Sequence, residues 1–562
     1  MRHKATTEGG QRSRATQRAL GRLDPFELKD RLIALAEESA RRGTQVLLNA
    51  GRGNPNWVAT GAREALFVLG AFAIGESRRA WDPKDSARGQ MGGAPRMEGI
   101  ARRLRAFLAR QPATPGAGLL NKGLRYGVSE LHLDADAFVH ELAAGVLGGH
   151  YPFPLRMLPH AERVVHEYLA RELCGDRPPR GRFELFATEG ATAGICYLFD
   201  SLLHNGLLRR GDRIALAVPI FTPYVEIPQL ARYAFDVVRL EASERRADAS
   251  HAWQYPDAEI DKLADPSIKA LFLVNPSNPP SVALRARTVR RLARLVNTKR
   301  PDLIVITDDV YATFVEGFRS LLAELPRNTV GVYSFSKYFG CTGWRLGVVA
   351  LHEDNVLDRR IAQLPARRRR AIERRYAGLA LEPAKLRFID RLVADSRQVA
   401  LNHTAGLSTP QQVQMALLAL FGLLGDGARY KRLARGIVQR RLAALYRGLG
   451  APLPADPLRA GYYCELDLMG WAERHYGREF MEFLARRHEP VDLLLRLAEQ
   501  SSIVLMPGGG FAGPQWSVRV SLANLPEQAY ARIGGQLHAA ARGYVEEWQA
   551  ARGRHHVKRR TQ

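Results

Sequence analysis

Seven short apolar runs constrain the fold of this chain more than any other feature of its sequence. They are rich in Val, Ile, Leu and Phe, and stretches with helical character separate them. The runs span 182–188, 212–221, 233–241, 268–276, 303–311, 331–337 and 345–352. Buried strands that alternate with helices are typical of a mostly parallel sheet covered on both faces. We therefore predict the α/β fold class, with a mostly parallel seven-stranded sheet between helices.

The length of the chain indicates more than one domain. The chain has 562 residues, which is more than a single compact core usually fills. We predict a large, cofactor-binding domain at 151–408, with a helical insertion at 353–400. Residues 26–150 and 409–552 are expected to build a smaller α/β domain. Its N-terminal part includes a Gly- and Arg-rich insertion, which we expect to be irregular structure with short helices.

The chain is strongly basic. Its formal net charge is +25, a balance that is common among nucleic-acid-binding proteins. The basic residues are scattered, however, and no zinc-finger, helix-turn-helix or aromatic-interleaved RNA motif accompanies them. We therefore expect no nucleic-acid partner and interpret the charge as an Arg-biased surface. The basic ends, 1–25 and 553–562, are expected to be disordered tails.

The sequence does not have the pattern of a membrane or secreted protein. No run approaches about 18 uninterrupted apolar residues, and the N-terminus lacks the apolar core of a signal peptide. An Arg-rich transit peptide is a weaker alternative. Four cysteines lie far apart and without metal-ligand spacing: Cys174, Cys196, Cys341 and Cys464. They predict free thiols in a reducing cytoplasm and no metal site.

Polar and small residues gather where several of the predicted strands end. Gly190, Ala191 and Thr192 form a strand-to-helix turn whose free N–H groups suit a phosphate. Asp308 ends another strand, and Tyr311 follows three residues later. Ligands of parallel sheets bind at the carboxyl ends of the strands. These residues are therefore expected to share one site.

Lys337 is the most informative of the strand-end residues. The stretch YSFSKYFGCTGWRLG places it after Ser334, and Arg345 follows eight positions later. A buried lysine is costly unless it is paired or has a chemical role. A lysine that forms an imine, hydroxyls and an arginine that hold a phosphate, and a carboxylate that pairs with a ring nitrogen together suit pyridoxal phosphate.

The motif SFSKYFGCTGWRLG resembles the lysine signature of the fold-type I pyridoxal-phosphate aminotransferases, S-x-S-K followed by G-x-R-x-G. The resemblance begins near residue 45 and runs through the rest of the chain up to the basic tail. It implies an enzyme with pyridoxal phosphate as cofactor and a homodimer, at least, with shared active sites. The stretches FELKDRLIALA, LLNAGRGNPNW and HYPFPLRMLPHAERVVHEYL further resemble the aspartate 4-decarboxylase branch of this family, which implies larger assemblies of dimers.

The resemblance also implies roles for individual residues around the cofactor. Lys337 would form the imine and later move the substrate Cα proton, and Asp308 would hold the proton of the ring nitrogen. Tyr311 and Asn278 would contact the ring 3′ oxygen, and Phe221 would stack on the ring. The residues that would hold the phosphate are Gly190, Ala191, Thr192, Ser334, Arg345 and, from a neighbouring subunit, Tyr151.

The reaction implied is loss of the β-carboxylate of L-aspartate as CO2 to give L-alanine, with aspartate aminotransferase activity toward 2-oxoglutarate as a side activity. Arg519 would grip the substrate α-carboxylate in a bidentate fork, next to Gly53 and Asn278. Arg52 stands where relatives usually carry an apolar residue. We hypothesise that Arg52 orients the β-carboxylate for loss, and a structural salt bridge is the alternative.

Other interpretations remain open at this level. An Asp at a strand end is often a cap, an Arg on an alternating strand is often solvated, and Phe221, Tyr311 and Tyr151 also suit ordinary packing. Alternative functions are a plain aminotransferase for aspartate, alanine or an aromatic amino acid, a DNA-binding regulator with an aminotransferase-like domain, and a non-catalytic scaffold. The regulator would need an N-terminal winged-helix module, and residues 1–45 are too short for one.

Overall fold

A computed structural model gives the structure of the protein. It describes residues 13–43, 46–82, 84, 91–111, 113–152, 156–175, 177–401 and 405–560, with the backbone alone for 26, 426 and 553–560. In this part of the chain no helix is long and apolar enough to cross a membrane. Nor do its His, Cys, Asp and Glu side chains form a group of three or more that could hold a metal ion.

The seven apolar runs form one seven-stranded sheet, as predicted. Its strands are β2 (Phe183–Thr188), β3 (Arg213–Val218), β4 (Asp236–Glu241), β5 (Ile268–Val274), β6 (Ile304–Asp308), β7 (Thr329–Ser334) and β8 (Gly347–His352). Their order across the sheet is β2-β8-β7-β6-β5-β3-β4. Only the β2–β8 and β7–β8 pairs are antiparallel, whereas the other pairs are parallel. The prediction of a mostly parallel sheet is confirmed.

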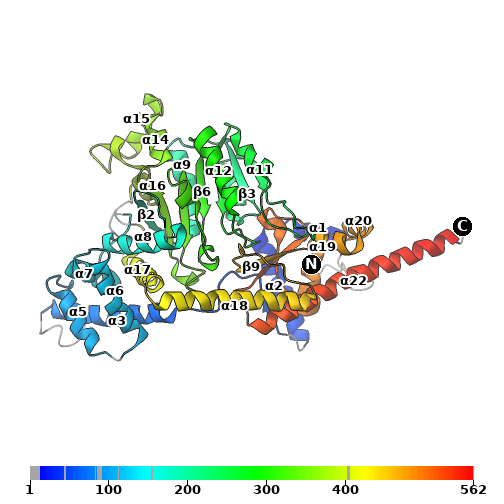
Figure 1. Ribbon diagram of the computed structural model, residues 1–562, viewed down its shortest axis with the longest axis horizontal. Coiled ribbons are helices and arrows are strands. Elements are labelled where there is room, and N and C mark those ends of the chain that lie inside the picture. The colour runs from blue at the N-terminus through cyan, green and yellow to red at the C-terminus, as the bar shows by residue number, and fades with distance from the viewer. Residues whose placement is uncertain are drawn as a thin grey trace, which may run out of the picture.

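Helices cover both faces of this sheet (Figure 1). Successive side chains of a strand point to opposite faces, so Leu216 packs into one core and Ala215 into another. The first core includes Phe199 of α9 (Ala191–His204), and the second includes Leu292 of α12 (Ala286–Lys299). The other helices around the sheet are α8 (Pro159–Cys174), α10 (Pro223–Glu226), α11 (Asp257–Asp261), α13 (Leu321–Glu324), α14 (Val356–Ala362), α15 (Ala366–Arg375) and α16 (Phe388–Ser396).

Segments from both ends of the chain share a separate core. It includes Leu32 of α2, Leu48 of β1, Ile503 of β10 and Tyr530 of α22. The strands here are β1 (Leu48–Asn49), β9 (Tyr463–Asp467), β10 (Ile503–Val504), β11 (Met506–Pro507) and β12 (Ser517–Ser521), with sheet orders β1-β10 and β11-β12-β9. The helices are α2 (Pro25–Arg42), α18 (Asp426–Leu449), α19 (Leu468–Tyr476), α20 (Arg478–Arg487), α21 (Asp492–Ser501) and α22 (Glu527–Arg560).

The N-terminal insertion is more regular than the irregular structure with short helices that we expected. It consists largely of α3 (Thr60–Arg79), α5 (Ile100–Ala109), α6 (Pro115–Ser129) and α7 (Ala135–Leu147). These helices pack against α8 and α17 (Thr409–Leu423), away from β9 in Figure 1. The glycines of α6 allow this packing: a Cβ at Gly123 would lie 2.9 Å from a Leu420 methyl carbon, and one at Gly116 would lie 2.6 Å from the Ala65 nitrogen.

The two tails also contain more structure than we expected. Helix α1 (Arg14–Gly21) falls within the predicted N-terminal tail. The Gln17 side chain is buried and its amide donates to Asp492 Oδ1 over 2.7 Å, which ties α1 to α21. At the other end, α22 is helical to Arg560 and projects from the body of the molecule (Figure 1). Short 3-10 helices lie at Ile227–Gln229, Lys262–Ala264, Ala312–Phe314, Thr342–Trp344, Pro383–Lys385 and Gly508–Phe511.

Candidate active site

The strand ends that sequence analysis singled out lie on one edge of the large sheet. Strands β2, β5, β6 and β7 run in the same direction, so their carboxyl ends meet there. Gly190 follows β2 and caps α9, Asp308 is the last residue of β6, and Lys337 follows the end of β7. Asn278 lies in the turn after β5.

The Lys337 amine reaches across to the N-terminal segment. Its Nζ donates to the carbonyl oxygen of Gly53 over 2.9 Å, and the Tyr462 hydroxyl donates to the same oxygen over 2.8 Å. A Cβ at Gly53 would lie 2.6 Å from the Tyr463 hydroxyl and 3.0 Å from Lys337 Nζ. The approach of these groups therefore requires glycine at position 53.

Asp308 is a buried carboxyl group, and no cationic side chain of the described residues forms an ion pair with it. Burial raises its pKa to about 7, although the Val310 N–H, the Lys337 charge and the Tyr224 hydroxyl act in the opposite direction. Its Oδ1 accepts from the Val310 N–H over 3.2 Å. A cation bound next to this carboxyl group would favour its ionised form, because opposite charges stabilise each other strongly at a buried site.

Asn278 links the residues predicted to surround the cofactor ring. Its amide nitrogen donates to the Tyr311 hydroxyl over 3.4 Å, and its Oδ1 accepts from Arg519 Nη1 over 3.5 Å. The Tyr311 ring lies 5.2 Å from the Tyr462 ring and 5.6 Å from the Tyr463 ring, centroid to centroid. The structure thus brings Asn278, Tyr311 and Arg519 together.

The predicted phosphate residues also cluster. Gly190 has a φ of +94°, and a Cβ there would lie 2.6 Å from Arg345 Nη2. Ala191 and Thr192 start α9, whose N-terminus offers free N–H groups and the positive end of the helix dipole. Ser334 ends β7, and its hydroxyl donates to the Leu346 carbonyl over 3.4 Å. A helix N-terminus, a hydroxyl and a guanidinium at one place suit a phosphate.

Arg519 is buried rather than solvated. Its side chain lies on β12 between two rings, with Cζ 4.4 Å from the centre of Tyr463 and 4.6 Å from that of Phe511. Nη2 donates to the Gly51 carbonyl over 2.9 Å. Among the described residues, its buried Nε has no hydrogen-bond partner. A buried guanidinium that lacks a carboxylate suits an anionic ligand.

Three of the predicted residues take no part in these contacts. Phe221 is half-buried three residues after β3. Tyr151 is 73% exposed, so its predicted contact with a neighbouring subunit stays a prediction. Arg52 is exposed, and the described part of the chain offers it no hydrogen bond or ion pair. The alternative of a structural salt bridge at Arg52 therefore finds no support.

Two tyrosines of β9 and its N-terminal flank belong to the site and were missed by sequence analysis. Tyr463 is buried, and its hydroxyl is directed at Lys337 and Tyr311. Burial alone would raise its pKa, but the charges of Lys337 and Arg519 outweigh burial and lower the pKa. Tyr462 binds the Gly53 carbonyl. The stretch GYYCELD indicates a strand, but nothing in it indicates which strand end it faces.

This set of residues fits pyridoxal phosphate by its chemistry. Asp308, with the buried Tyr224 hydroxyl directed at it, suits a protonated ring nitrogen. The cradle of Gly190 and Arg345, which a Cβ at position 190 would fill, suits the phosphate. The Lys337 amine suits the aldehyde carbon. Each of these features also occurs in proteins that bind other ligands. Their position together on one edge of the sheet is what indicates pyridoxal phosphate.

Comparison with known proteins agrees with this arrangement. Residues 184–535 match the family described as aminotransferase class I and II. A bifunctional aspartate aminotransferase and L-aspartate beta-decarboxylase of Pseudomonas is 47% identical over 533 residues, which is 95% of this chain and 98% of that protein.

Solved structures show the same fold at lower identity. An aspartate aminotransferase double mutant of Thermus thermophilus has a TM-score of 0.55 and 19% identity, and covers 91% of this chain and 96% of its own. An aromatic aminotransferase of Pyrococcus horikoshii has a TM-score of 0.53 and 18% identity, and the match covers 91% of this chain and 99% of that structure's chain. The chain belongs to the class I and II aminotransferases, a family that uses pyridoxal phosphate.

Proposed function

We propose that this protein removes the β-carboxylate of L-aspartate to give L-alanine and CO2, and that it also transfers the amino group of aspartate to 2-oxoglutarate. The observation that carries this proposal is the 47% identity, over almost the full length of both chains, to the Pseudomonas protein with those two activities in its name. The Lys337, Asp308 and Arg519 cluster is the geometry that such chemistry requires.

Lys337 and Asp308 are the residues that we assign to proton chemistry. Bound pyridoxal phosphate would supply an electron sink for negative charge on the substrate carbons. Lys337 would take the proton from the substrate Cα and return it, because its amine is held at the centre of the site by Gly53 and Tyr463. Asp308 would hold the proton on ring nitrogen N1, as an ionised carboxylate favours that form. Asn278 and Tyr311 would orient the ring oxygen.

Arg519 and Arg52 are assigned to the two carboxylates of aspartate. Arg519 would bind the α-carboxylate, since its guanidinium is buried, fixed between two rings and short of one acceptor. Arg52 follows Gly51, whose carbonyl binds Arg519, and its side chain is free to turn toward the distal carboxylate. An interaction that is stronger in the transition state than with the bound substrate speeds loss of CO2.

The proposal includes an assembly of at least two copies with shared active sites and a cytoplasmic location. The exposed Tyr151 ring, which the resemblance assigns to a neighbouring phosphate site, supports the shared site. Free cysteines at all four positions support a reducing compartment.

Product analysis tests the reaction. Purified protein with pyridoxal phosphate and L-aspartate, but without 2-oxoglutarate, should release CO2 and alanine in equal amounts over many turnovers. Oxaloacetate should appear when 2-oxoglutarate is added. If oxaloacetate forms only with 2-oxoglutarate and little CO2 is released, the protein is a plain aminotransferase and the decarboxylase proposal is wrong.

A further inference from the structure

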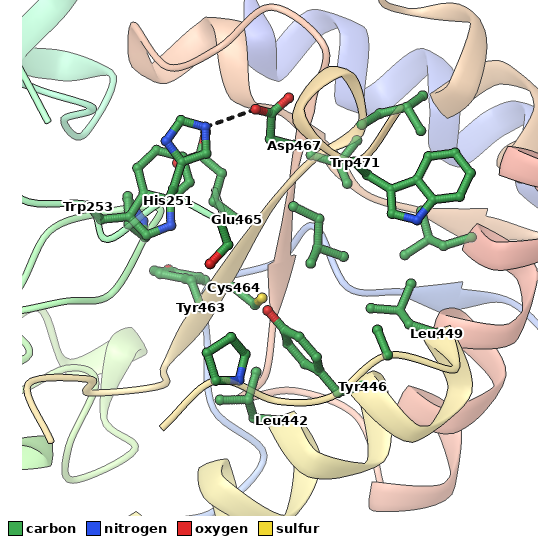
Figure 2. Close-up of a pocket in the computed structure, with 18 of the residues that line it drawn as sticks. His251, Trp253, Leu442, Tyr446, Leu449, Tyr463, Cys464, Glu465, Asp467 and Trp471 are labelled. Carbon is green, nitrogen blue, oxygen red and sulfur yellow. Dashed lines mark hydrogen bonds and ion pairs between the residues drawn. The ribbon is translucent and has the colours of Figure 1, made fainter. Parts of the chain in front are cut away.

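A cavity of about 190 Å³ lies beside β9, outside the cluster of Lys337 and Asp308 (Figure 2). Six consecutive residues of the chain, 463–468, contribute to its wall. Side chains of a strand alternate between its two faces, so a cavity that contacts both faces lies at the edge of the strand. Strand β9 is indeed at the end of its three-stranded sheet.

One half of the cavity is apolar. Leu442, Tyr446 and Leu449 line it from one side of α18, where residues four and three positions apart share a face. Trp471 of α19 and Leu537 of α22 complete this half. An engineered protein cavity of about 150 Å³ holds benzene. The space is therefore large enough for one aromatic ring with a short substituent.

The other half carries acceptor groups that lack donors. Glu465 is only 6% exposed, and its Oε1 accepts from the Ser517 hydroxyl over 2.7 Å. Within the described part of the chain, Glu465 Oε2 and Asp467 Oδ1 have no hydrogen-bond partner although both are buried. The second oxygen of Asp467 accepts from His251 Nε2 over 2.8 Å. Figure 2 shows His251, Glu465 and Asp467 along one side of the space and Tyr446, Leu449 and Trp471 along the other.

The arginines of the cavity wall already have other acceptors. Arg246 pairs with Asp456 over 2.6 Å, Arg459 Nη1 donates to the Pro454 carbonyl over 2.8 Å, and Arg474 Nη1 donates to the Ala249 carbonyl over 3.5 Å. Burial raises the pKa of Glu465 to about 8, because the hydrogen bond from Ser517 and the charge of Arg519 offset burial only in part. Among the described residues these buried carboxyl oxygens have no donor, and a buried polar group is costly until it is paired. A cation bound beside Glu465 would favour its ionised form, because opposite charges stabilise each other at a buried site.

We propose that this cavity binds a small arylalkylammonium ion, with its ring among Tyr446, Leu449 and Trp471 and its N–H at the Glu465 carboxylate. The ring accounts for the size and apolar half of the cavity. The ammonium group accounts for the missing donor, since a carboxylate accepts strong charge-assisted hydrogen bonds from such a group. This binding does not depend on the reaction proposed above.

The cavity shares walls with the candidate active site. Both Tyr463, whose hydroxyl is directed at Lys337, and Pro280, two residues after Asn278, line it. The Ser281 hydroxyl accepts from the Tyr462 N–H over 3.1 Å, and this bond fixes the turn after β5 to the start of β9. A ligand in the cavity would therefore contact the two segments that carry Asn278 and Tyr463.

Calorimetric titration of the full-length holoprotein with N,N-dimethyl-2-phenylethylammonium near neutral pH tests the proposal. This tertiary ammonium ion cannot form an imine with the cofactor, so heat from that reaction is avoided. We expect saturable binding with one site per chain and an unchanged visible absorbance of the cofactor. The neutral analogue 2-phenylethanol should bind about tenfold more weakly or worse, as expected for loss of a hydrogen bond to a charged group, and the anion 3-phenylpropionate should not bind.

Two variants and one control place the binding in the cavity. Leu449→Trp fills the apolar half and should abolish binding, and Glu465→Gln keeps the shape but removes the charge and should weaken binding about tenfold. Glu473→Gln, an exposed residue of α19 outside the cavity wall, should bind as the wild type does. No saturable binding of the ammonium ion, equal binding of 2-phenylethanol, or wild-type affinity in Glu465→Gln would each overturn the proposal.

Discussion

The candidate active site has two walls, which the chain assembles in different ways. The first wall is the carboxyl edge of the large sheet, where Asp308 ends β6 and Lys337 follows the neighbouring strand β7. The second wall joins the N-terminal segment to the start of β9, through a hydrogen bond between Gly53 and Tyr462, which are 409 positions apart. The difference indicates that the first wall carries the chemistry common to the family, whereas the second depends on how the two ends of the chain pack. Changes in the first wall should stop turnover, and changes in the second should alter its rate or outcome by degrees.

Lys337→Ala should have the largest effect. It removes both the amine that would bind the cofactor covalently and the base that would move the Cα proton. We expect decarboxylation to fall by about 10⁴-fold or more, the upper end of what a positioned acid–base group contributes. Mass spectrometry after borohydride reduction should find the cofactor attached to the wild type and not to the variant. Lys385→Ala, at an exposed lysine, should keep both attachment and turnover, and a variant at 337 that still turned over aspartate would contradict the assignment.

Asp308→Asn should have the next largest effect. The amide cannot hold a proton on the ring nitrogen through charge, and loss of one partner of a buried charged pair costs roughly 3–5 kcal/mol, or about two to four decades in rate. The measurement is kcat at saturating pyridoxal phosphate. Asp309→Asn is the matched control, because Asp309 is equally buried but bonds to Thr307 and Ser320. This control variant should lower the melting temperature, whereas kcat of the folded enzyme should change little.

The first wall was predictable from sequence because its information is local. Seven apolar runs became seven strands, and Asp308 and Lys337 were located by their position near the carboxyl ends of two of those runs. The second wall was only partly predictable. Arg519 and Gly53 were identified by resemblance, but Tyr463 was missed, since its place beside Lys337 depends on the register of β9 with β12. No local pattern encodes that register.

The helical region at 60–147 was not predictable for a related reason. Its glycines serve packing between helices rather than turns, as the 2.6 Å approach at Gly116 illustrates. Glycine lowers intrinsic helix propensity, so the sequence of α6 indicates irregular structure. Only the partner helix reveals that the missing side chain is needed. The same holds for α1, where the buried Gln17 finds its partner in Asp492, far along the chain.

Gly53→Ala tests whether the second wall sets the rate. The added Cβ would meet both the Tyr463 hydroxyl and Lys337 Nζ, so the amine would be displaced by a fraction of an ångström or more. Misplacement of about 1 Å can cost roughly 100-fold, and we expect kcat/KM for aspartate to fall by about 10- to 100-fold. Gly70→Ala, in α3 with nothing within 4 Å of its added Cβ, is the control and should leave kcat/KM unchanged. Equal activities of the two variants would mean that the second wall does not position Lys337.

Tyr463→Phe should have a smaller effect of the same kind. The ring would remain in place under Arg519, while the hydroxyl that contacts Lys337 would be lost. A hydrogen bond to a charged group is worth about 1.5–3 kcal/mol, so kcat should fall by about tenfold or somewhat more, with little change in KM. Tyr462→Phe removes only the bond to the Gly53 carbonyl and should reduce kcat less. A loss confined to KM in Tyr463→Phe would contradict a role beside Lys337.

Arg52→Ala should have the smallest effect on total turnover of aspartate and the largest effect on the ratio of decarboxylation to transamination. Arg52 is exposed and has no partner in the described part of the chain, so its removal should leave the melting temperature within about 1 °C, as surface substitutions usually do. If Arg52 orients the β-carboxylate, the ratio of CO2 to oxaloacetate should fall by about tenfold, equivalent to one charge-assisted hydrogen bond.

Arg52→Lys keeps the charge and should give an intermediate ratio, and Arg78→Ala, at an exposed arginine of α3, should not change it. Because Lys337 and Asp308 are untouched, total consumption of aspartate with 2-oxoglutarate present should persist. An unchanged ratio in Arg52→Ala would mean that other residues of the second wall select between the two reactions.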